Sequence, residues 1–158
     1  MSSLRVGLGV DAHALADGVP LVLGGVPFEH PRGLAGHSDG DVLAHALVDA
    51  VLGAAGLGDI GSLFPPGDDR FRGADSVQLL REAYGQVRDA GWSLVNADCI
   101  LVGEEPRIAA RRDEMRARLS AAVGGAEVNV RATTTDRLGF AGRGEGLAAY
   151  AVALIERA

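Results

Sequence analysis

The sequence contains no lysine, a single cysteine and few aromatic residues. All 15 basic residues are arginine, so an individual arginine carries little functional information. Cys99 has no second cysteine with which to form an internal disulfide, which suits the reducing cytoplasm, where we expect the protein to act. Aromatic residues make up only 4% of the chain, which argues against base stacking on a nucleic-acid surface. The net charge of −6 also argues against nucleic-acid and acidic-membrane partners.

Long hydrophobic runs are missing as well. No 18 consecutive residues are apolar, so no membrane-spanning helix is expected, and the residues after Met1 lack the apolar region of a signal peptide. A length of 158 residues fits one domain, 1–158, and the 47% of hydrophobic residues suffices for a continuous core.

Two hydrophobic periodicities alternate along the chain and predict an α+β fold. A period of two predicts strands over residues 4–10, 95–101 and 128–132, with a short hairpin over 20–28. A period near 3.6 predicts helices over 41–57, 75–90 and 107–123. A final helix is expected over about residues 145–157, and because residues 147–155 are almost wholly apolar, we expect it to be buried and to pack against other subunits. We therefore predict a single domain with a mixed, mostly four-stranded sheet and helices packed on one face.

A first group of polar residues has the spacing of metal ligands. Asp11 and His13 lie two apart where the first predicted strand ends, so their side chains can point to the same ion. His45 lies in the helix predicted over 41–57. Two histidines and one aspartate leave a fourth position open, as in catalytic zinc sites. Alone, the Asp-x-His pair is weak evidence for a metal site. A lone histidine beside an apolar stripe is likewise more often a hydrogen-bonded core residue than a metal ligand.

Two aspartates flank His45 by one helical turn, and they allow a structural interpretation. Asp41 fits best as the cap of the helix, whereas Asp49 could support a ligand. The loop over 58–74 follows this helix and is longer than an ordinary connection, which favours an active-site role. Within it, Asp59 could orient a substrate hydroxyl, although Asp, Gly and Pro are also the residues that turns favour.

A second polar group follows the last predicted strand before the apolar C-terminal segment. Residues Thr133-Thr134-Thr135-Asp136 precede a glycine-rich turn, a pattern that can surround a phosphate. Asp136 could hold a hard cation such as Mg²⁺ that bridges phosphate oxygens. A β-rich threonine run followed by a loop that needs glycine explains the same residues equally well. Neither a P-loop nor a dinucleotide-binding glycine motif is present, which disfavours an ordinary NTPase or dinucleotide enzyme.

In combination these segments resemble the 2-C-methyl-D-erythritol 2,4-cyclodiphosphate synthase family of the non-mevalonate isoprenoid pathway. The resemblance runs in order from about residue 4 to 157. Its most specific segments are His37-Ser38-Asp39-Gly40-Asp41 and Gly142-Arg143-Gly144-Glu145-Gly146. The other matching segments are Gly9-Val10-Asp11-Ala12-His13, Leu23-Gly24-Gly25-Val26, Gly58-Asp59-Ile60-Gly61, Phe64-Pro65, Gly73-Ala74-Asp75-Ser76, Thr133-Thr134-Thr135 and Leu138-Gly139-Phe140.

The resemblance implies a metal-dependent phosphorus–oxygen lyase that assembles as a homotrimer, with active sites between adjacent subunits. Its substrate is 4-diphosphocytidyl-2-C-methyl-D-erythritol 2-phosphate, and its products are the cyclic diphosphate and CMP. Asp11, His13 and His45 match the ligands of one zinc ion per subunit. Asp136 matches a glutamate that binds a second cation, Mg²⁺ or Mn²⁺. His37 and Thr134 match positions that stabilise the transition state.

The resemblance also implies three groups of substrate-binding residues. The methylerythritol-binding segment and the loop around it contribute Ser38, Asp59, Ile60, Gly61, Phe64 and Asp68. The cytidine-binding stretch and the threonine run contribute Gly103, Pro106, Arg107, Ile108, Thr133 and Thr135. Phe140 and Arg143 match residues that line the central cavity of the trimer.

Two positions depart from the family pattern, and two other functions remain open. Asp136 is one methylene shorter than the usual glutamate, so a water can intervene between it and the cation. Glu105 precedes Pro106 where a neutral or basic residue is common, and Arg107 replaces a lysine. The alternatives are a phosphoesterase that uses the same ligands to activate water, and a non-catalytic trimeric nucleotide-binding module with a structural metal.

Overall fold

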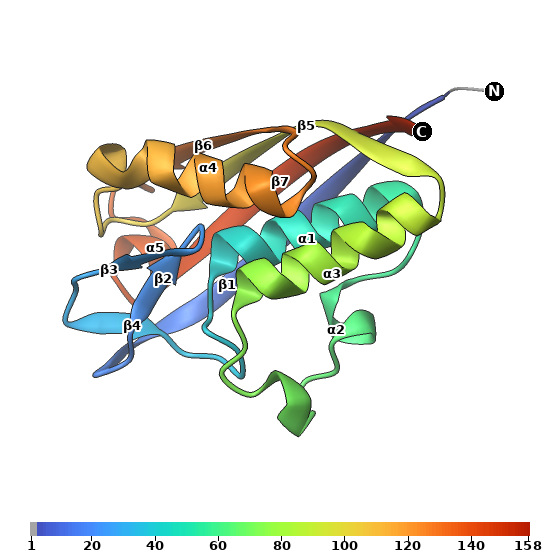
Figure 1. Ribbon diagram of the computed structural model, residues 1–158. Coiled ribbons are helices and arrows are strands. Elements are labelled where there is room, and N and C mark those ends of the chain that lie inside the picture. Colours follow the sequence, from blue (N-terminus) through green and yellow to red (C-terminus); the bar gives the residue numbers. More distant parts are fainter. Residues whose placement is uncertain (1–2) are drawn as a thin grey trace.

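A five-stranded sheet forms the centre of the computed structural model, which describes residues 3–158 (Figure 1). The strand order is β4-β1-β7-β5-β6, and all pairs are antiparallel except β5 with β6. The strands are β1 (Leu4–Asp17), β4 (Arg32–Leu34), β5 (Trp92–Val102), β6 (Glu127–Thr133) and β7 (Gly146–Arg157). Two short strands, β2 (Leu21–Leu23) and β3 (Val26–Phe28), form the predicted hairpin beside it. The prediction of a mixed sheet in an α+β fold is confirmed, but the sheet has five strands rather than four.

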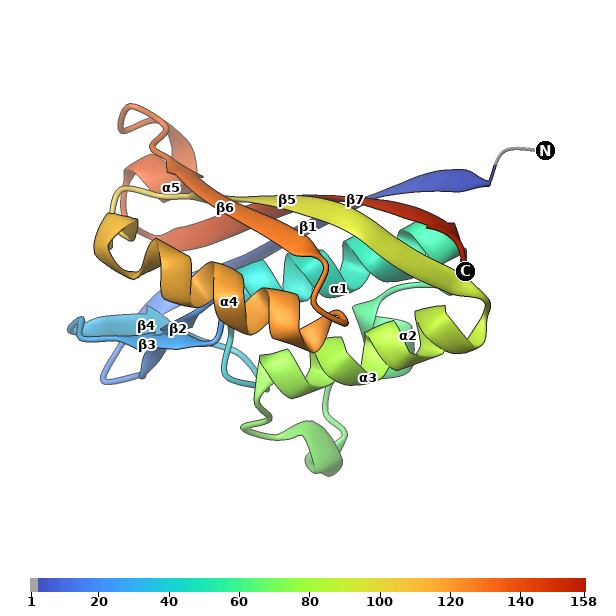
Figure 2. The same ribbon diagram turned by 45° about the horizontal axis from the view of Figure 1, so that its top comes forward.

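The longer helices cover one face of the sheet, as predicted (Figure 2). They are α1 (Val42–Ala55), α3 (Ser76–Asp89) and α4 (Arg112–Ala122), and two short helices are α2 (Ile60–Leu63) and α5 (Gly139–Gly142). Single 3₁₀ turns, η1 (Asp69–Phe71) and η2 (Ala109–Arg111), precede α3 and α4. Residues 107–111 therefore lie outside the α-helix predicted over 107–123. Within residues 3–158, no helix is long and apolar enough to cross a membrane.

The predicted C-terminal helix is wrong, because residues Gly146–Arg157 form β7, the central strand of the sheet. Alanine favours helices, and the segment lacks a continuous polar face, so its composition suggested a buried helix. The structure instead pairs the segment with β1 on one side and β5 on the other. Its side chains alternate accordingly, since Ala151 and Ala153 are buried while Tyr150 and Val152 are exposed.

Helix α1 lies between the sheet and α3, and it is buried almost all round. Two glycines of β1 allow this close approach. A Cβ atom at Gly7 would lie 2.0 Å from the carbonyl oxygen of Ala50, and one at Gly9 would lie 1.8 Å from that of Ala46. Because these neighbours are backbone atoms, any other residue would force the helix away from the strand.

Aspartate side chains fix the beginnings of the two central helices. The Asp41 side chain caps α1 by accepting from the Ala44 N–H at 3.2 Å, which confirms its predicted structural role. It also accepts from the N–H groups of Gly24 and Gly25 at 2.9 and 2.8 Å, so it joins the β2–β3 turn to α1. Asp75 caps α3 in the same way by accepting from the Val77 N–H at 2.9 Å.

Within residues 3–158, none of the three longer helices covers the other face of the sheet, which exposes apolar side chains. Val6 and Leu8 of β1 are 67% and 64% exposed, and Tyr150 and Val152 of β7 are 44% and 45% exposed. Because β1 and β7 are neighbours, these side chains form one continuous apolar strip along the sheet. Such a strip is typical of a surface that another molecule covers.

Candidate metal centre and adjoining cavities

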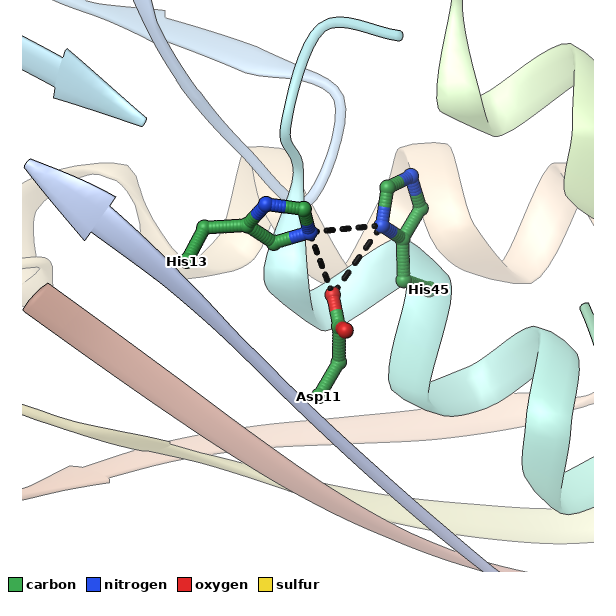
Figure 3. Close-up of side chains that lie close together, drawn as sticks. All are labelled: Asp11, His13 and His45. Carbon is green, nitrogen blue, oxygen red and sulfur yellow. Dashed lines mark hydrogen bonds and ion pairs between the residues drawn. The ribbon is translucent and has the colours of Figure 1, made fainter. Parts of the chain in front are cut away.

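Asp11, His13 and His45 lie together between β1 and α1 (Figure 3). The Asp11 Oδ2 atom is 2.9 Å from His13 Nε2 and 3.0 Å from His45 Nδ1, and the two nitrogens are 3.3 Å apart. Strand β1 is longer than predicted and continues to Asp17, so Asp11 and His13 lie inside the strand rather than at its end. Both face the helices because they are two residues apart, and α1 brings His45 against them.

The surroundings of this cluster fit a divalent cation with nitrogen and oxygen ligands. The second ring nitrogen of each histidine is bound elsewhere, as in protein metal sites. His13 Nδ1 lies 2.7 Å from the carbonyl oxygen of Ala35. His45 Nε2 lies 2.7 Å from Ser76 Oγ and 3.0 Å from Ser38 Oγ. Two imidazoles and one carboxylate with an open side are the donors that zinc prefers at catalytic sites.

The charges in the cluster are strongly coupled. Burial alone would raise the pKa of Asp11, but hydrogen bonds from His13 and His45, together with their charge, lower it to about 2. The hydrogen bond to Asp11 raises the pKa of His13, and this effect outweighs the opposing effect of burial. The carboxylate is therefore ionised throughout the physiological range and can hold a positive charge at this point.

A cavity of about 240 Å³ opens beside the cluster. Its wall contains the three cluster residues, His37, Ser38, Ile60, Gly61, Pro66 and an apolar side formed by Phe64, Phe71 and Leu79. Several residues matched by the sequence resemblance thus share one cavity. His37 also fixes its rim, because its Nε2 lies 2.7 Å from the carbonyl oxygen of Asp68.

The remaining acidic residues near this cavity have structural partners. Asp59 caps α2 and accepts from the Ser62 N–H at 2.8 Å. The Asp68 carboxylate forms an ion pair with Arg70 at 2.7 Å. Asp49 accepts from the Ile60 N–H at 2.7 Å, so it holds the start of α2 against α1.

Thr134, Arg107 and Arg143 line a different, larger cavity of about 480 Å³. Arg32, Glu104 and Arg137 are also on its wall, and several glycines form its floor. Phe140 lines a third depression that also includes His13. One chain therefore does not bring Thr134 into the cavity of the metal cluster.

The residues around Thr134 are joined mainly by backbone contacts. The Gly103 N–H donates to the carbonyl oxygen of Thr133 at 3.0 Å, which ties the stretch over 103–108 to the threonine run. The Ile108 side chain is only 2% exposed and belongs to the core. Thr133 and Thr135 donate their hydroxyls to nearby carbonyls at 3.1 and 2.6 Å, and Pro106 follows a cis peptide bond.

Asp136 and Arg137 form an unusual turn, and Arg137 lines the second cavity. Both have positive φ angles, 52° and 66°, which residues other than glycine rarely adopt. The turn is held by the Arg137 N–H, which donates to Glu104 Oε1 at 2.8 Å, and by the Asp136 N–H, which donates to Thr134 Oγ1 at 3.3 Å. The Asp136 side chain is exposed and points to no second carboxylate cluster among residues 3–158. Backbone strain held in this way is typical of functional sites.

Three residues with clear roles were not assigned by the sequence analysis. In the sequence, Ser76 and Asp39 belong only to segments that match the family, and Glu104 carries no assigned role. Their partners lie 31 to 37 residues away in the chain. Local spacing cannot reveal such contacts; the one available signal is the position of Ser76 and Asp39 within segments that match the family.

Comparison with known proteins matches nearly the whole chain to a single protein family and its relatives. Residues 4–156 match the YgbB family. A protein of Rubrobacter xylanophilus named 2-C-methyl-D-erythritol 2,4-cyclodiphosphate synthase is 58% identical, over 100% of this chain and 98% of its own. The structure of the bifunctional IspDF from Campylobacter jejuni is 41% identical with a TM-score of 0.93, over 98% of this chain and 42% of that longer one. A 2C-methyl-D-erythritol-2,4-cyclodiphosphate synthase in a CDP-bound form is 38% identical with a TM-score of 0.87, over 96% of this chain and all of that one.

Proposed function

The chain belongs to the YgbB family, and we infer that it converts 4-diphosphocytidyl-2-C-methyl-D-erythritol 2-phosphate to 2-C-methyl-D-erythritol 2,4-cyclodiphosphate, with release of CMP, in the non-mevalonate isoprenoid pathway. The observation that carries this function is the Asp11, His13 and His45 cluster at the mouth of a cavity, in a chain related to these synthases over its full length. The whole chain, 1–158, serves as one catalytic domain.

The reaction needs alignment rather than a protein nucleophile. An oxygen of the 2-phosphate forms a bond to the β-phosphorus, and the bond from that phosphorus to the bridging oxygen breaks. The electron pair of the broken bond leaves with CMP, so the ring closes without consuming water, and the enzyme is a phosphorus–oxygen lyase. The protein must hold two anions together that repel each other, and it must offset the charge that grows on the leaving group.

We assign the cluster to zinc, with Asp11, His13 and His45 as its protein ligands. A zinc ion there supplies positive charge that offsets the charge developing on the β-phosphate. Asp136 is assigned to a second cation, Mg²⁺ or Mn²⁺, that accompanies the diphosphate. Its exposed carboxylate, held on the strained turn, can reach such a cation directly or through water.

The other residues bind and orient the two ends of the substrate. Ser38, Ile60, Gly61 and Phe64 surround the methylerythritol part, because they line the cavity beside the cluster. Asp59 and Asp68 keep the loop around it in shape through the contacts described above, and a substrate hydroxyl can bind at Asp59. We assign to His37 and Thr134 the polar contacts that stabilise the transition state.

The cytidine part binds along the stretch that contains Gly103, Pro106, Arg107 and Ile108, next to Thr133 and Thr135. Backbone N–H and carbonyl groups are the contacts offered there, since the Ile108 side chain is buried. A CDP-bound relative supports a nucleotide ligand for this family member. Glu105 lies beside this stretch on the wall of the second cavity, where its carboxylate is 3.3 Å from His30 Nε2.

We further propose a homotrimer in which adjacent subunits complete each active site. Two observations support it. The apolar strip on β1 and β7 needs a cover, and a second copy of the chain provides a matching one. In addition, the metal cluster and Thr134 line separate cavities of one chain, so a neighbouring copy is needed to join them. Phe140 and Arg143 then face the interior of the assembly.

The function is tested with purified protein, the cytidine diphosphate substrate and Mg²⁺, followed by mass spectrometry and ³¹P NMR. We expect a cyclic diphosphate and one CMP for each substrate consumed, with no ¹⁸O incorporated from labelled water. Free phosphate and incorporation of ¹⁸O would instead establish a phosphoesterase. Nucleotide binding without turnover would establish the non-catalytic module.

A further inference from the structure

His45 faces the metal cluster with one ring nitrogen and two hydroxyl groups with the other. Nδ1 lies 3.0 Å from Asp11 Oδ2, whereas Nε2 lies 2.7 Å from Ser76 Oγ and 3.0 Å from Ser38 Oγ. A neutral imidazole carries a single proton, and only its unprotonated nitrogen can donate an electron pair to a metal ion. The group that decides the position of this proton therefore decides whether His45 is a ligand.

The Ser76 hydroxyl determines the position of the His45 proton, and Asp39 in turn fixes the orientation of that hydroxyl. The Ser76 hydroxyl has one proton, and it donates this proton in a hydrogen bond to Asp39 Oδ1. The other oxygen of the same carboxylate accepts the Ser76 N–H at 3.1 Å, so the carboxylate is fixed against both groups of one residue. Once its proton is engaged, Ser76 Oγ can only accept a hydrogen bond from His45. The proton of the imidazole then lies on Nε2, and the lone pair of Nδ1 faces the cluster.

The two histidines are consequently held in opposite protonation patterns. His13 places Nδ1 against the Ala35 carbonyl, which can only accept, so its proton lies on Nδ1 and Nε2 faces the cluster. In His45 the proton lies on Nε2 instead, and Nδ1 faces the cluster. For His13 a backbone carbonyl can be the acceptor, because residue 35 follows β4, which pairs with β1. For His45, which is 6% exposed and lies on a helix, a side chain from α3 supplies the acceptor.

We propose that Ser76, anchored by Asp39, is a positioning residue that holds His45 as its Nε2–H tautomer and so prepares Nδ1 as a metal ligand. The inference rests on the proposed metal site and assigns a role to residues that do not touch the metal. Ser76 is fully buried at the first position of α3, so its hydroxyl does not exchange partners with solvent. Asp39, Ser76 and His45 thus form a hydrogen-bonded relay. Asp39 also donates its N–H to the Ala74 carbonyl at 3.1 Å, which joins the end of the loop over 58–74 to this relay.

A purely structural role for the pair predicts different behaviour. The bond from the Ser76 N–H to Asp39 stabilises the beginning of α3, and its loss would lower the free energy of unfolding. That loss would leave the tautomer of His45 and the metal affinity of the folded protein unchanged. Both quantities must therefore be measured besides stability and activity.

The tautomer is measured in the wild-type protein by NMR after labelling with ¹⁵N-histidine. The chain has only four histidines, so the ring-nitrogen spectrum is simple. In the zinc-loaded protein we expect a proton on Nε2 of His45 and on Nδ1 of His13. A proton on Nδ1 of His45 overturns the proposal, and this measurement does not depend on any variant folding.

Zinc affinity is then measured by competition with a chelator for Ser76→Ala and its control. Ser120→Ala is the matched control, because the Ser120 hydroxyl donates at 2.7 Å to the Ala126 carbonyl far from the cluster. We expect Ser76→Ala to weaken zinc binding by about 10- to 100-fold, as for other residues that orient metal ligands. Ser76→Thr, which keeps the hydroxyl, restores most of the affinity, and Ser120→Ala leaves it unchanged.

The contribution of Asp39 is tested in a double-mutant cycle. If Asp39 acts through Ser76, Asp39→Asn weakens zinc binding in the wild-type background and adds little to Ser76→Ala. If the two substitutions instead reduce zinc affinity independently and additively, the proposed relay is wrong. It is also wrong if a folded Ser76→Ala variant binds zinc with wild-type affinity. Failure of the wild-type protein to bind zinc at all would overturn the proposed metal site itself, whereas zinc binding that is insensitive to Ser76 overturns only this inference.

Discussion

Replacing Gly9 by alanine tests whether the contact between β1 and α1 sets the geometry of the metal cluster. The added Cβ atom would lie 1.8 Å from the carbonyl oxygen of Ala46 and 2.8 Å from the backbone N of Ala50. Ordinary contacts between such atoms begin near ~3.5 Å. Because the obstructing atoms are backbone, no side-chain rotation relieves the overlap, and α1 must move away from β1 by roughly 1.5 Å.

This displacement acts on stability and on metal binding together. Overpacking of a core typically destabilises a protein by about 1–3 kcal/mol, and an overlap with backbone atoms belongs at the upper end or beyond. His45 is the residue next to Ala46 on α1, and Asp11 lies two residues after Gly9 on β1. Metal sites tolerate deviations of only about 0.2 Å in ligand distance, so we expect zinc affinity to fall at least tenfold.

The assay combines urea denaturation of the metal-free protein with zinc competition on the folded variant. Gly85→Ala is the control, since a Cβ atom at this exposed position of α3 meets no atom within 4 Å. The control is expected to gain about 0.5–1 kcal/mol from helix propensity and to bind zinc normally. Wild-type stability and zinc affinity in Gly9→Ala would refute the argument that this contact positions the ligands.

Three further predictions concern the metal ligands and the exposed sheet face. His45→Ala loses CMP release because a ligand is removed, while circular dichroism shows a retained fold; undiminished CMP release contradicts the metal assignment. Zinc affinity falls about tenfold for each pH unit below the pKa of His13, because zinc competes there with one proton. Asp11 raises the pKa of His13 above 6.5, so the loss of zinc affinity begins above pH 6.5. A zinc affinity that stays constant from about pH 8 to pH 6 contradicts this prediction. Val6→Asp, at a side chain 67% exposed on the apolar strip, dissociates the trimer in analytical ultracentrifugation, whereas an unchanged mass argues against that interface.

The metal cluster could be predicted from the sequence because its geometry follows from local periodicity. Residues two apart on a strand share a face, which brings Asp11 and His13 together whether the strand ends at residue 11 or continues to Asp17. The prediction that His45 joins them depended on a helix that packs on this strand. Gly7 and Gly9, which make that packing possible, were interpreted only as strand alternation.

The last strand could not be predicted from its own residues. Alanine-rich apolar segments fit a buried helix and a central strand equally well, and only the availability of two partner strands decides between them. The same limit applies to Ser76 and Asp39. Their contact with each other spans 37 residues and requires the loop over 58–74 to run back to the beginning of α1, which no local pattern encodes.

The place of β7 at the middle of the sheet has a consequence for folding during synthesis. The ribosome makes this strand after every other element, yet both β1 and β5 pair with it. Only residues 15–17 of β1 pair with β4, so the longer part of β1, from Leu4 to Ala14, lacks its partner strand in the sheet until β7 is made. Until then the sheet exists only as separate fragments with open edges, and pairing between such distant segments is slow. A stop codon at the beginning of β7 therefore removes the strand that joins these fragments and leaves their edges open to aggregation.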